Sequence, residues 1–336
     1  RRVLDPFCGS GAILVAAHRH GIPVSGVDIN PIAALFCRVK LNGFDAVATR
    51  HLAQTWIERA ERTKEPFPVP WEGKHYWFTP ATIQKFERLR SVSLALRLSD
   101  SDEGLALLLS YVLAVRLCSR ADQRSPKPFI SKQANQSRKG RHFDPYRTLR
   151  TLLDGLCTLY GGSVQKSQHQ FLLADVPNAP STVQRLGKHS HIITSPPYIN
   201  AQDYFRNFKL ELHLLEDILP FRIADLRERF IGTERGNLLR GVPKETLDAN
   251  LQILPELEVL QRRNSRLAAV VHRYLHEMGR AFDVVKPCLE PNGCFVLVCG
   301  DNLLGGLRIR TWYVLQHLLE QRGLHLFDRF ADAIGD

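Results

Sequence analysis

Residues 3–14, Val3-Leu4-Asp5-Pro6-Phe7-Cys8-Gly9-Ser10-Gly11-Ala12-Ile13-Leu14, decide the fold of this 336-residue chain. They predict a strand, a glycine-rich turn and a helix in immediate succession. Gly9 and Gly11 let the backbone turn tightly and approach a ligand closely, and the first N–H groups of the following helix suit an anionic group. We therefore interpret residues 5–11 as a cofactor loop. Its GxG spacing behind Asp5-Pro6 differs from the GxGxxG dinucleotide fingerprint.

A second predicted strand, Val24 to Asp28, ends in an acid, and a helix follows from Ile32 to Leu41 with Pro31 suited to its first turn. Asp28 lies 23 residues after Asp5, close to the roughly 20-residue spacing at which a carboxylate reaches ribose hydroxyls. Asp28 could instead cap the helix. The glycine loop in front of it favours ribose binding.

The stretch Thr194-Ser195-Pro196-Pro197-Tyr198 follows the apolar pair Ile192-Ile193. Two successive prolines cannot donate to a ladder or continue a helix, so we expect the strand to end in a rigid tip. The Ser195 side chain and the Pro196 carbonyl could accept hydrogen bonds from an exocyclic amine while Tyr198 stacks on the heteroaromatic ring. The alternative is a proline-stiffened loop with a surface tyrosine.

Together these motifs resemble the S-adenosylmethionine-dependent amino-methyltransferases of DNA, the N4-cytosine and N6-adenine methylases. The first family motif is usually DPFxGxGT, and this chain has Ala12 in place of the threonine. Ser195 at the first tip position resembles the N4-cytosine subgroup more. The resemblance implies catalytic roles for Ser195, Pro196, Pro197 and Tyr198, and S-adenosylmethionine binding by Asp5, Pro6, Phe7, Gly9, Gly11, Asp28 and Asp175.

Asp175 ends another predicted strand, Gln170 to Ala174, and lies 19 residues before Thr194. In the resembling family an acid after this strand contacts the adenine amino group of the cofactor. The alternative interpretation is an ordinary turn aspartate before Pro177. The residues alone favour neither.

The net charge of +11 is concentrated between Arg116 and Arg150, where ten basic residues face only Asp122 and Asp144. A polyanionic partner explains such a segment, because Lys and Arg that neutralise phosphates release counterions. The alternative is a solvated or disordered basic loop. The predicted nucleic-acid contacts are Arg124, Lys127, Lys132, Arg138, Lys139 and Arg141, with Arg235 in a later glycine-rich loop, and Gln133, Asn135 and Gln136 are candidate base-edge readers.

The predicted fold is α/β, a Rossmann-like, doubly wound and mostly parallel sheet of the class I methyltransferase kind with a helical insertion. We divide the chain into a cofactor-binding half (1–53), a basic, mostly helical insertion that we interpret as the target-recognition region (54–162) and a catalytic half (163–336). Residues 294–299 predict a fully buried strand, residues 256–285 one long helix, and residues 325–329 the start of a last strand. The resemblance also implies a cofactor-binding segment before Arg1, where we expect residues to be missing.

Seven scattered cysteines, an odd number, favour free thiols in a reducing compartment. No zinc-site spacing is present, so we predict no metal. No apolar run reaches the roughly 18 residues that a membrane span requires. These features favour a cytoplasmic protein.

The sequence therefore predicts a site-specific methyltransferase that moves a methyl group from S-adenosylmethionine to the exocyclic amine of a flipped base in double-stranded DNA, N4-cytosine favoured over N6-adenine. Restriction-modification or phage defence, with a nuclease or other defence partner, is the expected setting. One alternative is a tRNA guanine-N2 methyltransferase, a class that shares DPFCGSG and Pro-Pro-Tyr but usually has Asp where this chain has Ser195. Another is a catalytically silent, DNA-binding methylase-like subunit.

Overall fold

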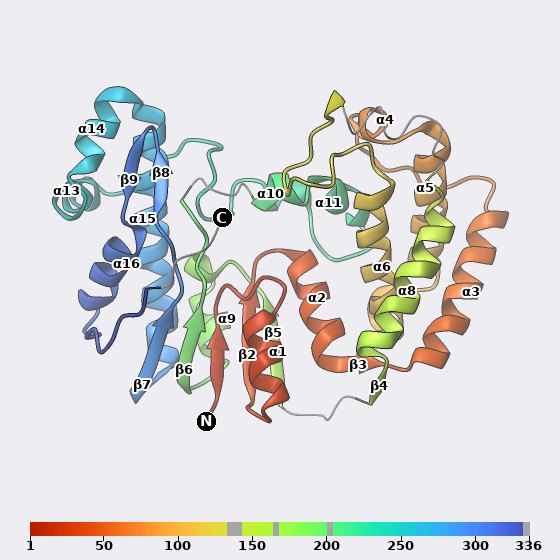
Figure 1. The fold of residues 1–336 in the computed structure, drawn as a ribbon, viewed down its shortest axis with the longest axis horizontal. Coiled ribbons are helices and arrows are strands. Elements are labelled where there is room, and N and C mark those ends of the chain that lie inside the picture. The colour runs from red at the N-terminus through yellow and green to blue at the C-terminus, as the bar shows by residue number, and fades with distance from the viewer. Residues whose placement is uncertain (133–142, 164–167, 200–203, 332–336) are drawn as a thin grey trace. The chain divides into compact units, whose positions relative to one another are not determined.

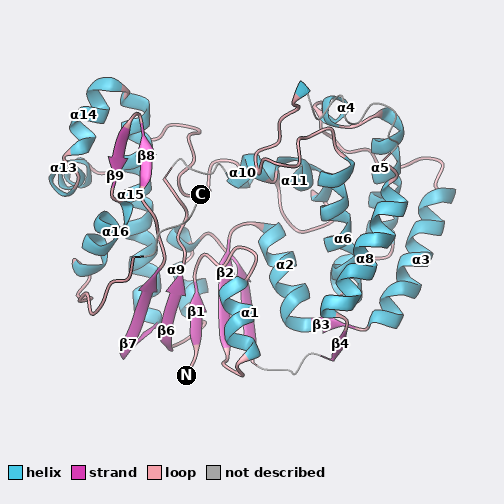
Figure 2. Ribbon diagram, viewed as in Figure 1, coloured by secondary structure: helices cyan, strands magenta, loops and turns pink. Residues whose placement is uncertain are grey.

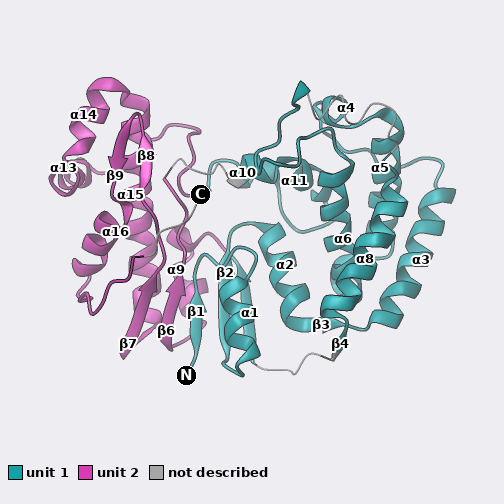
Figure 3. Cartoon of the chain, in the orientation of Figure 1, with its two compact units in different colours: residues 1–173, 204–230 teal, residues 174–203, 231–336 magenta. Residues whose placement is uncertain are grey.

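The computed structural model describes residues 1–132, 143–163, 168–199 and 204–331 (Figure 1). These residues form two compact units, each assembled from segments that are distant in sequence (Figure 3). Unit 1 comprises residues 1–173 and 204–230, and unit 2 comprises residues 174–203 and 231–336. The boundaries predicted after residues 53 and 162 divide the chain by expected function, whereas the two units are defined by compactness. Those boundaries therefore stay predictions.

Unit 1 combines parallel strands with a set of helices (Figure 2). Its parallel strands lie in the order β5-β2-β1, with Val24 of β2 opposite Val3 of β1 and His169 of β5. The elements are β1 (Val3–Asp5), α1 (Ala12–Arg19), β2 (Val24–Asp28), α2 (Pro31–Asn42), β3 (Gly43–Phe44), α3 (Ala46–Arg62), α4 (Lys74–Trp77), α5 (Pro80–Ala95), α6 (Asp102–Cys118), α8 (Pro145–Tyr160), β4 (Gly162–Ser163), β5 (His169–Leu173), α10 (Tyr204–Asn207), α11 (Lys209–Leu215) and α12 (Ile223–Leu226).

The helical part of unit 1 surrounds α6, which is apolar on every side and almost entirely buried. Tyr111 of α6 is fully buried between Trp56 of α3 and Phe86 of α5, and the Phe86 and Tyr111 rings meet edge to face with centroids 5.3 Å apart. The sequence Thr79-Pro80 is typical of a helix start, and α5 begins there: Thr79 Oγ1 accepts a hydrogen bond from the Thr82 N–H. The described residues of the predicted insertion, 54–132 and 143–162, are thus mostly helical.

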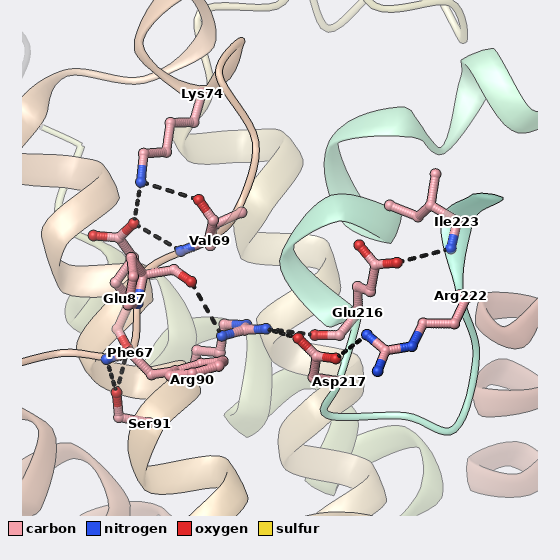
Figure 4. A network of polar contacts seen from close by, with 11 residues as sticks. Phe67, Val69, Lys74, Glu87, Arg90, Ser91, Glu216, Asp217, Arg222 and Ile223 are labelled. Carbon is pink, nitrogen blue, oxygen red and sulfur yellow. Dashed lines mark hydrogen bonds and ion pairs between the residues drawn. The ribbon is translucent and has the colours of Figure 1, made fainter.

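A buried ion pair ties the segment 204–230 to this helical part (Figure 4). The Arg90 side chain has no exposed surface, and its Nη2 lies 2.6 Å from Asp217 Oδ2 and donates to the Glu216 carbonyl at 2.8 Å. The guanidinium also lies over the Phe67 ring, 4.3 Å from its centroid. Residues 204–230, which follow the Ser-Pro-Pro-Tyr motif in sequence, thus pack with the helices of the predicted insertion.

Unit 2 contains the parallel pair β6-β7 and the antiparallel hairpin β8-β9. The long helix α15 supplies most of its core, and Phe282 packs edge to face on Phe295 of β7 with ring centroids 5.8 Å apart. The elements are α9 (Pro180–Gln184), β6 (His189–Thr194), α13 (Lys244–Ile253), α14 (Glu256–Arg263), α15 (Ser265–Val285), β7 (Leu289–Leu297), β8 (Asn302–Leu304), β9 (Leu307–Ile309) and α16 (Thr311–Glu320).

The single helix predicted for residues 256–285 is wrong. It is two helices, because the Asn264 side chain accepts a hydrogen bond from the Leu267 N–H at 3.0 Å and begins α15 as its cap. An asparagine that bonds to the nearby backbone competes with helix continuation.

Two strand predictions are also wrong. Residues 294–299 do not form a fully buried strand: within the described residues β7 pairs with β6 alone, and Val296 and Val298 are 38% and 54% exposed. Residues 325–329 form no strand and are exposed. An apolar run predicts burial only if a neighbour covers it, which the run itself does not encode.

The predicted fold class is confirmed. Five strands, three in unit 1 and two in unit 2, run parallel to their neighbours, and helices alternate with them along the chain. This is an α/β arrangement with a mostly parallel sheet, consistent with the class I methyltransferase fold.

Candidate functional site

The glycine-rich loop of unit 1 connects β1 to α1 as a closed turn. The Gly11 N–H donates to the Cys8 carbonyl at 2.8 Å, and the Cys8 N–H donates to the Val27 carbonyl of β2 at 3.1 Å. Gly9 and Gly11 have φ values of 49° and 79°, which residues with a Cβ rarely adopt. A Cβ on Gly11 would lie 2.8 Å from Cys37 Sγ, whereas a Cβ on Gly9 would meet no atom within 4 Å. The space beside Gly9 is therefore open.

Asp28 joins the end of β2 to this loop. Its Oδ2 accepts from the Gly9 N–H at 2.9 Å, and its Oδ1 accepts from the Asn30 N–H at 2.8 Å. Burial raises the pKa of the Asp28 carboxyl, and these backbone donors oppose the rise. The alternative that Asp28 caps α2 is wrong, because the Asn30 side chain accepts from the Ile32 N–H and is the cap. The structure thus brings the loop and Asp28 together, while ribose binding stays a prediction.

Asp5, Pro6 and Phe7 form the base of the loop. Asp5 and Pro6 are buried and Phe7 is half-buried. Asp5 Oδ1 accepts a hydrogen bond from the Phe7 N–H at 3.1 Å, so this carboxyl stabilises the turn after β1. A direct contact of these residues with a cofactor stays a prediction.

Helix α2 supports the loop through two residues that sequence reasoning missed. Cys37 Sγ donates to the Gly9 carbonyl at 3.4 Å and lies 3.8 Å from Cys8 Sγ. Lys40 Nζ donates to the Ser10 carbonyl at 2.8 Å. Both residues occupy ordinary helix positions in the sequence, so no local signal marks them.

The Ser-Pro-Pro-Tyr tip, residues 195–198 of unit 2, begins where β6 ends. The Thr194 carbonyl still accepts from the Val298 N–H at 2.9 Å, and none of the four tip residues belongs to a strand. The strand therefore ends at the proline pair, as predicted. Ser195 is exposed, Pro196 is buried, and Pro197 and Tyr198 are half-buried.

Side chains from two other elements of unit 2 hold the backbone beside the tip. The Tyr274 hydroxyl of α15 donates to the Pro197 carbonyl at 2.8 Å. Asn302 Nδ2 of β8 donates to the Ile199 carbonyl at 3.2 Å, and Thr311 Oγ1 donates to Asn302 Oδ1 at 2.8 Å. Sequence reasoning missed all three, because a tyrosine in an apolar helix face resembles any core residue.

The carbonyls of the tip differ in their hydrogen bonds. The Pro197 carbonyl accepts from Tyr274, whereas no described residue donates to the Pro196 carbonyl.

Asp175 lies in unit 2 between β5 and a short 3₁₀ turn, Val176–Asn178. Asn178 Nδ2 donates to Asp175 Oδ2 at 2.8 Å, and the Asn178 N–H donates to the Asp175 carbonyl at 2.9 Å. Asp175 also helps to raise the pKa of Glu277, after burial, the main cause. These bonds favour the interpretation of Asp175 as an ordinary turn aspartate. Its contact with the adenine amino group of the cofactor stays a prediction.

Comparison with curated proteins finds two relatives, both type II methyltransferases named M.AvaI, from Nostoc sp. and Anabaena variabilis. Each is 26% identical to this chain over 97% of the chain and 73% of the relative. The chain is a homologue of type II methyltransferases. No family model matches it, and no solved structure matches it significantly.

The residues predicted to bind nucleic acid lie in unit 1, in unit 2 and outside the described residues. Arg124 is ion-paired with Asp122 at 2.6 Å, and that contact lowers the pKa of the Asp122 carboxyl well below its usual range. Lys127 is half-buried and Lys132 is exposed. Arg235 belongs to unit 2, is half-buried, and accepts a hydrogen bond from Arg273 through its carbonyl. Outside the described residues lie Arg138, Lys139, Arg141, Gln133, Asn135 and Gln136.

The described residues contain no group of three or more His, Cys, Asp or Glu side chains placed to hold a metal ion. All seven cysteines are free thiols, five of them buried. In residues 1–132, 143–163, 168–199 and 204–331, no helix is long and apolar enough to cross a membrane.

Proposed function

We propose that this chain is a site-specific DNA methyltransferase that transfers a methyl group from S-adenosylmethionine to the exocyclic amine of a flipped base, N4 of cytosine rather than N6 of adenine. The relationship to type II methyltransferases over 97% of the chain supports methyl transfer. The proposed setting is restriction-modification or phage defence.

The observation that carries the proposal is the Ser-Pro-Pro-Tyr tip: Tyr274 holds its Pro197 carbonyl, Ser195 is exposed, and no described residue donates to its Pro196 carbonyl. An exocyclic amine is a poor nucleophile, because its lone pair is delocalised into the ring. Two acceptors, Pro196 O and the exposed Ser195 hydroxyl, would draw its N–H bonds out of the ring plane and aim the lone pair at the methyl group. Tyr198 would stack on the base.

The loop of unit 1 fits S-adenosylmethionine. Asp28 uses one lone pair of each carboxyl oxygen on backbone N–H groups, and the others can accept from ribose hydroxyls. The open space beside Gly9 admits a ligand close to the backbone. Helix α1 begins at Gly11 with no side-chain cap, so its first N–H groups can receive a carboxylate. The bound cofactor supplies an activated methyl group, and no metal is required.

The target amine is unreachable inside a duplex, so the base must leave the stack at a cost of a few kcal/mol. The exposed Lys132 and the neighbouring basic residues of unit 1 provide charge that holds the phosphates during that step. This electrostatic contact carries no sequence information, so the recognised sequence must be read by other contacts.

The test is transfer of labelled methyl groups to unmethylated duplex DNA and, in parallel, to bulk tRNA, followed by nucleoside mass spectrometry. We expect N4-methylcytosine in the DNA and no label in tRNA. N6-methyladenine would correct the target base, and label in tRNA alone would overturn the DNA proposal. Cofactor binding without transfer to either would favour the silent subunit.

The matched variants are Ser195→Ala and Ser181→Ala, which remove an exposed serine hydroxyl from the tip and from α9, respectively. If Ser195 accepts from the amine, its variant loses about 10²-fold or more in turnover, as general positioning contacts do. The α9 variant keeps its activity. Equal activity in the two variants would remove Ser195 from the proposed mechanism.

A further inference from the structure

The backbone of the Ser-Pro-Pro-Tyr tip has one soft torsion. The proline rings fix φ of Pro196 and Pro197 at about −65°. A following proline restricts ψ of Ser195 and of Pro196 to the extended region. The ψ angle of Pro197 is the remaining free rotation before Tyr198, and it sets where both the Pro197 carbonyl and the Tyr198 ring point.

Tyr274 acts on this rotation. Its side chain has no exposed surface, so the packing of α15 fixes the position of its hydroxyl. The hydroxyl donates to the Pro197 carbonyl at 2.8 Å. Rotation about ψ of Pro197 would break this bond, so the bond opposes the rotation.

Asn302 acts on the other side of Tyr198. Its amide donates to the Ile199 carbonyl at 3.2 Å, and the buried Thr311 hydroxyl orients that amide through Asn302 Oδ1. Tyr198 is thus held between two carbonyls that each have a fixed donor.

We propose that Tyr274 is a positioning residue for methyl transfer: it fixes the Tyr198 ring relative to the Ser195 hydroxyl and the Pro196 carbonyl, with Asn302 and Thr311 holding the far side. The inference rests on the proposed function of the tip. A base that stacks on Tyr198 then has its amine beside both acceptors without any rearrangement of the tip. Misplacement by about 1 Å can cost on the order of 10²-fold in rate.

Tyr274→Phe tests this inference, with Tyr111→Phe as the matched control. Tyr111 is equally buried, and its hydroxyl also donates to a backbone carbonyl, that of Phe86 at 3.3 Å, in the helical part of unit 1. We expect Tyr274→Phe to lower the single-turnover methyl transfer rate by about 10- to 100-fold. Its dissociation constants for S-adenosylmethionine and duplex DNA stay unchanged, and the control keeps the wild-type rate. An unchanged rate in Tyr274→Phe overturns the inference.

Thr311→Val is a milder variant that serves if Tyr274→Phe folds poorly. It keeps the shape of a buried side chain and removes the hydroxyl that orients Asn302. Because one net hydrogen bond is worth about 1 kcal/mol, we expect a rate loss of about fivefold with unchanged binding of both substrates. Weakened binding with an unchanged rate would contradict a positioning role.

Amide hydrogen exchange in the ligand-free protein separates this inference from the proposed function. We expect the Tyr198 and Ile199 amides to exchange at least about fivefold faster in Tyr274→Phe than in wild type or Tyr111→Phe, because local opening becomes easier. No increase means that Tyr274 does not hold the tip. If the wild-type protein methylates nothing, the proposed function fails, and the exchange result still decides whether Tyr274 restrains Tyr198.

Discussion

The Gly9 N–H donates to Asp28 Oδ2 over 2.9 Å, so the glycine turn after β1 is hydrogen-bonded directly to the acid at the end of β2. The two residues are 19 positions apart in the sequence. A ligand that reaches Asp28 must therefore pass beside the loop backbone. The two predicted cofactor motifs of unit 1 thus depend on each other.

Asp28→Asn should weaken S-adenosylmethionine binding by about tenfold or more, a loss of at least ~1.4 kcal/mol. An amide has one acceptor oxygen, so it cannot serve both the Gly9 and the Asn30 N–H groups and still accept from a ribose. Calorimetric titration measures the affinity. Asp45→Asn, which changes an exposed cap of α3, is the control and should bind normally. An affinity of Asp28→Asn within twofold of wild type would contradict ribose binding.

Alanine at Gly9 and at Gly11 should have separable effects. Both substitutions force a Cβ into a left-handed conformation, at about 1–2 kcal/mol each. At Gly11 the Cβ also collides with Cys37, so Gly11→Ala should unfold at lower denaturant concentration than Gly9→Ala. Gly9→Ala fills open space and should lose cofactor affinity beyond its stability cost. Chemical unfolding measures the stability of the two variants, and cofactor titration measures their affinity. The same stability and the same affinity in both variants would contradict separate roles for Gly9 and Gly11.

Local signals predicted several elements correctly. Pro31 and Thr79-Pro80 mark the starts of α2 and α5 because their backbone preferences act within one turn. The break at Asn264 is also local, because Asn264 lies in the polar run of residues 261–266 between the apolar residues of α14 and α15.

Other features depend on distant partners and have no signature in the sequence. The exposure of Val296 follows from the pairing of β7 with β6 alone among the described residues. Tyr274 contacts Pro197, 77 residues earlier in the chain. At the candidate site, sequence therefore identifies the loop, Asp28 and the tip, but not the residues that support them.

Arg90→Met should lower the free energy of unfolding by about 1–3 kcal/mol, because the Glu216 carbonyl loses its buried donor while Asp217, which is 25% exposed, keeps its ion pair with Arg222. Arg97→Met is the control: that arginine pairs with Asp100 while its side chain is 81% exposed, so its loss should cost less than about 1 kcal/mol. Urea unfolding of each variant measures the difference. The double variant Arg90→Met, Asp217→Asn should cost less than the sum of the two single changes, and additive effects would show that the two residues are not coupled.

Lys132→Gln should reduce DNA affinity and lower the slope of log K against log salt concentration by about 0.9, the value for one lost phosphate contact. Lys64→Gln removes an equally exposed charge at the end of α3 and should leave the slope unchanged. Arg124→Gln should fall between the two, because Asp122 already holds its guanidinium. Binding isotherms at several salt concentrations provide the measurement. Equal slopes for the Lys132 and Lys64 variants would place the DNA elsewhere.

Glu211→Gln should stabilise the protein above pH 7 and not below pH 4.5. Glu211 is buried on α11, and among the described residues its Oε2 has no hydrogen-bond partner. Burial raises the pKa of its carboxyl from 4.5 to about 7, with its own backbone and Arg116 opposing the rise. Between these values the unfolded state loses its proton and the folded state keeps it, so rising pH removes about 3 kcal/mol of folding stability. Urea unfolding at pH 4.5 and 8 tests this against Glu258→Gln, an exposed control on α14, and a difference that does not change with pH would contradict it.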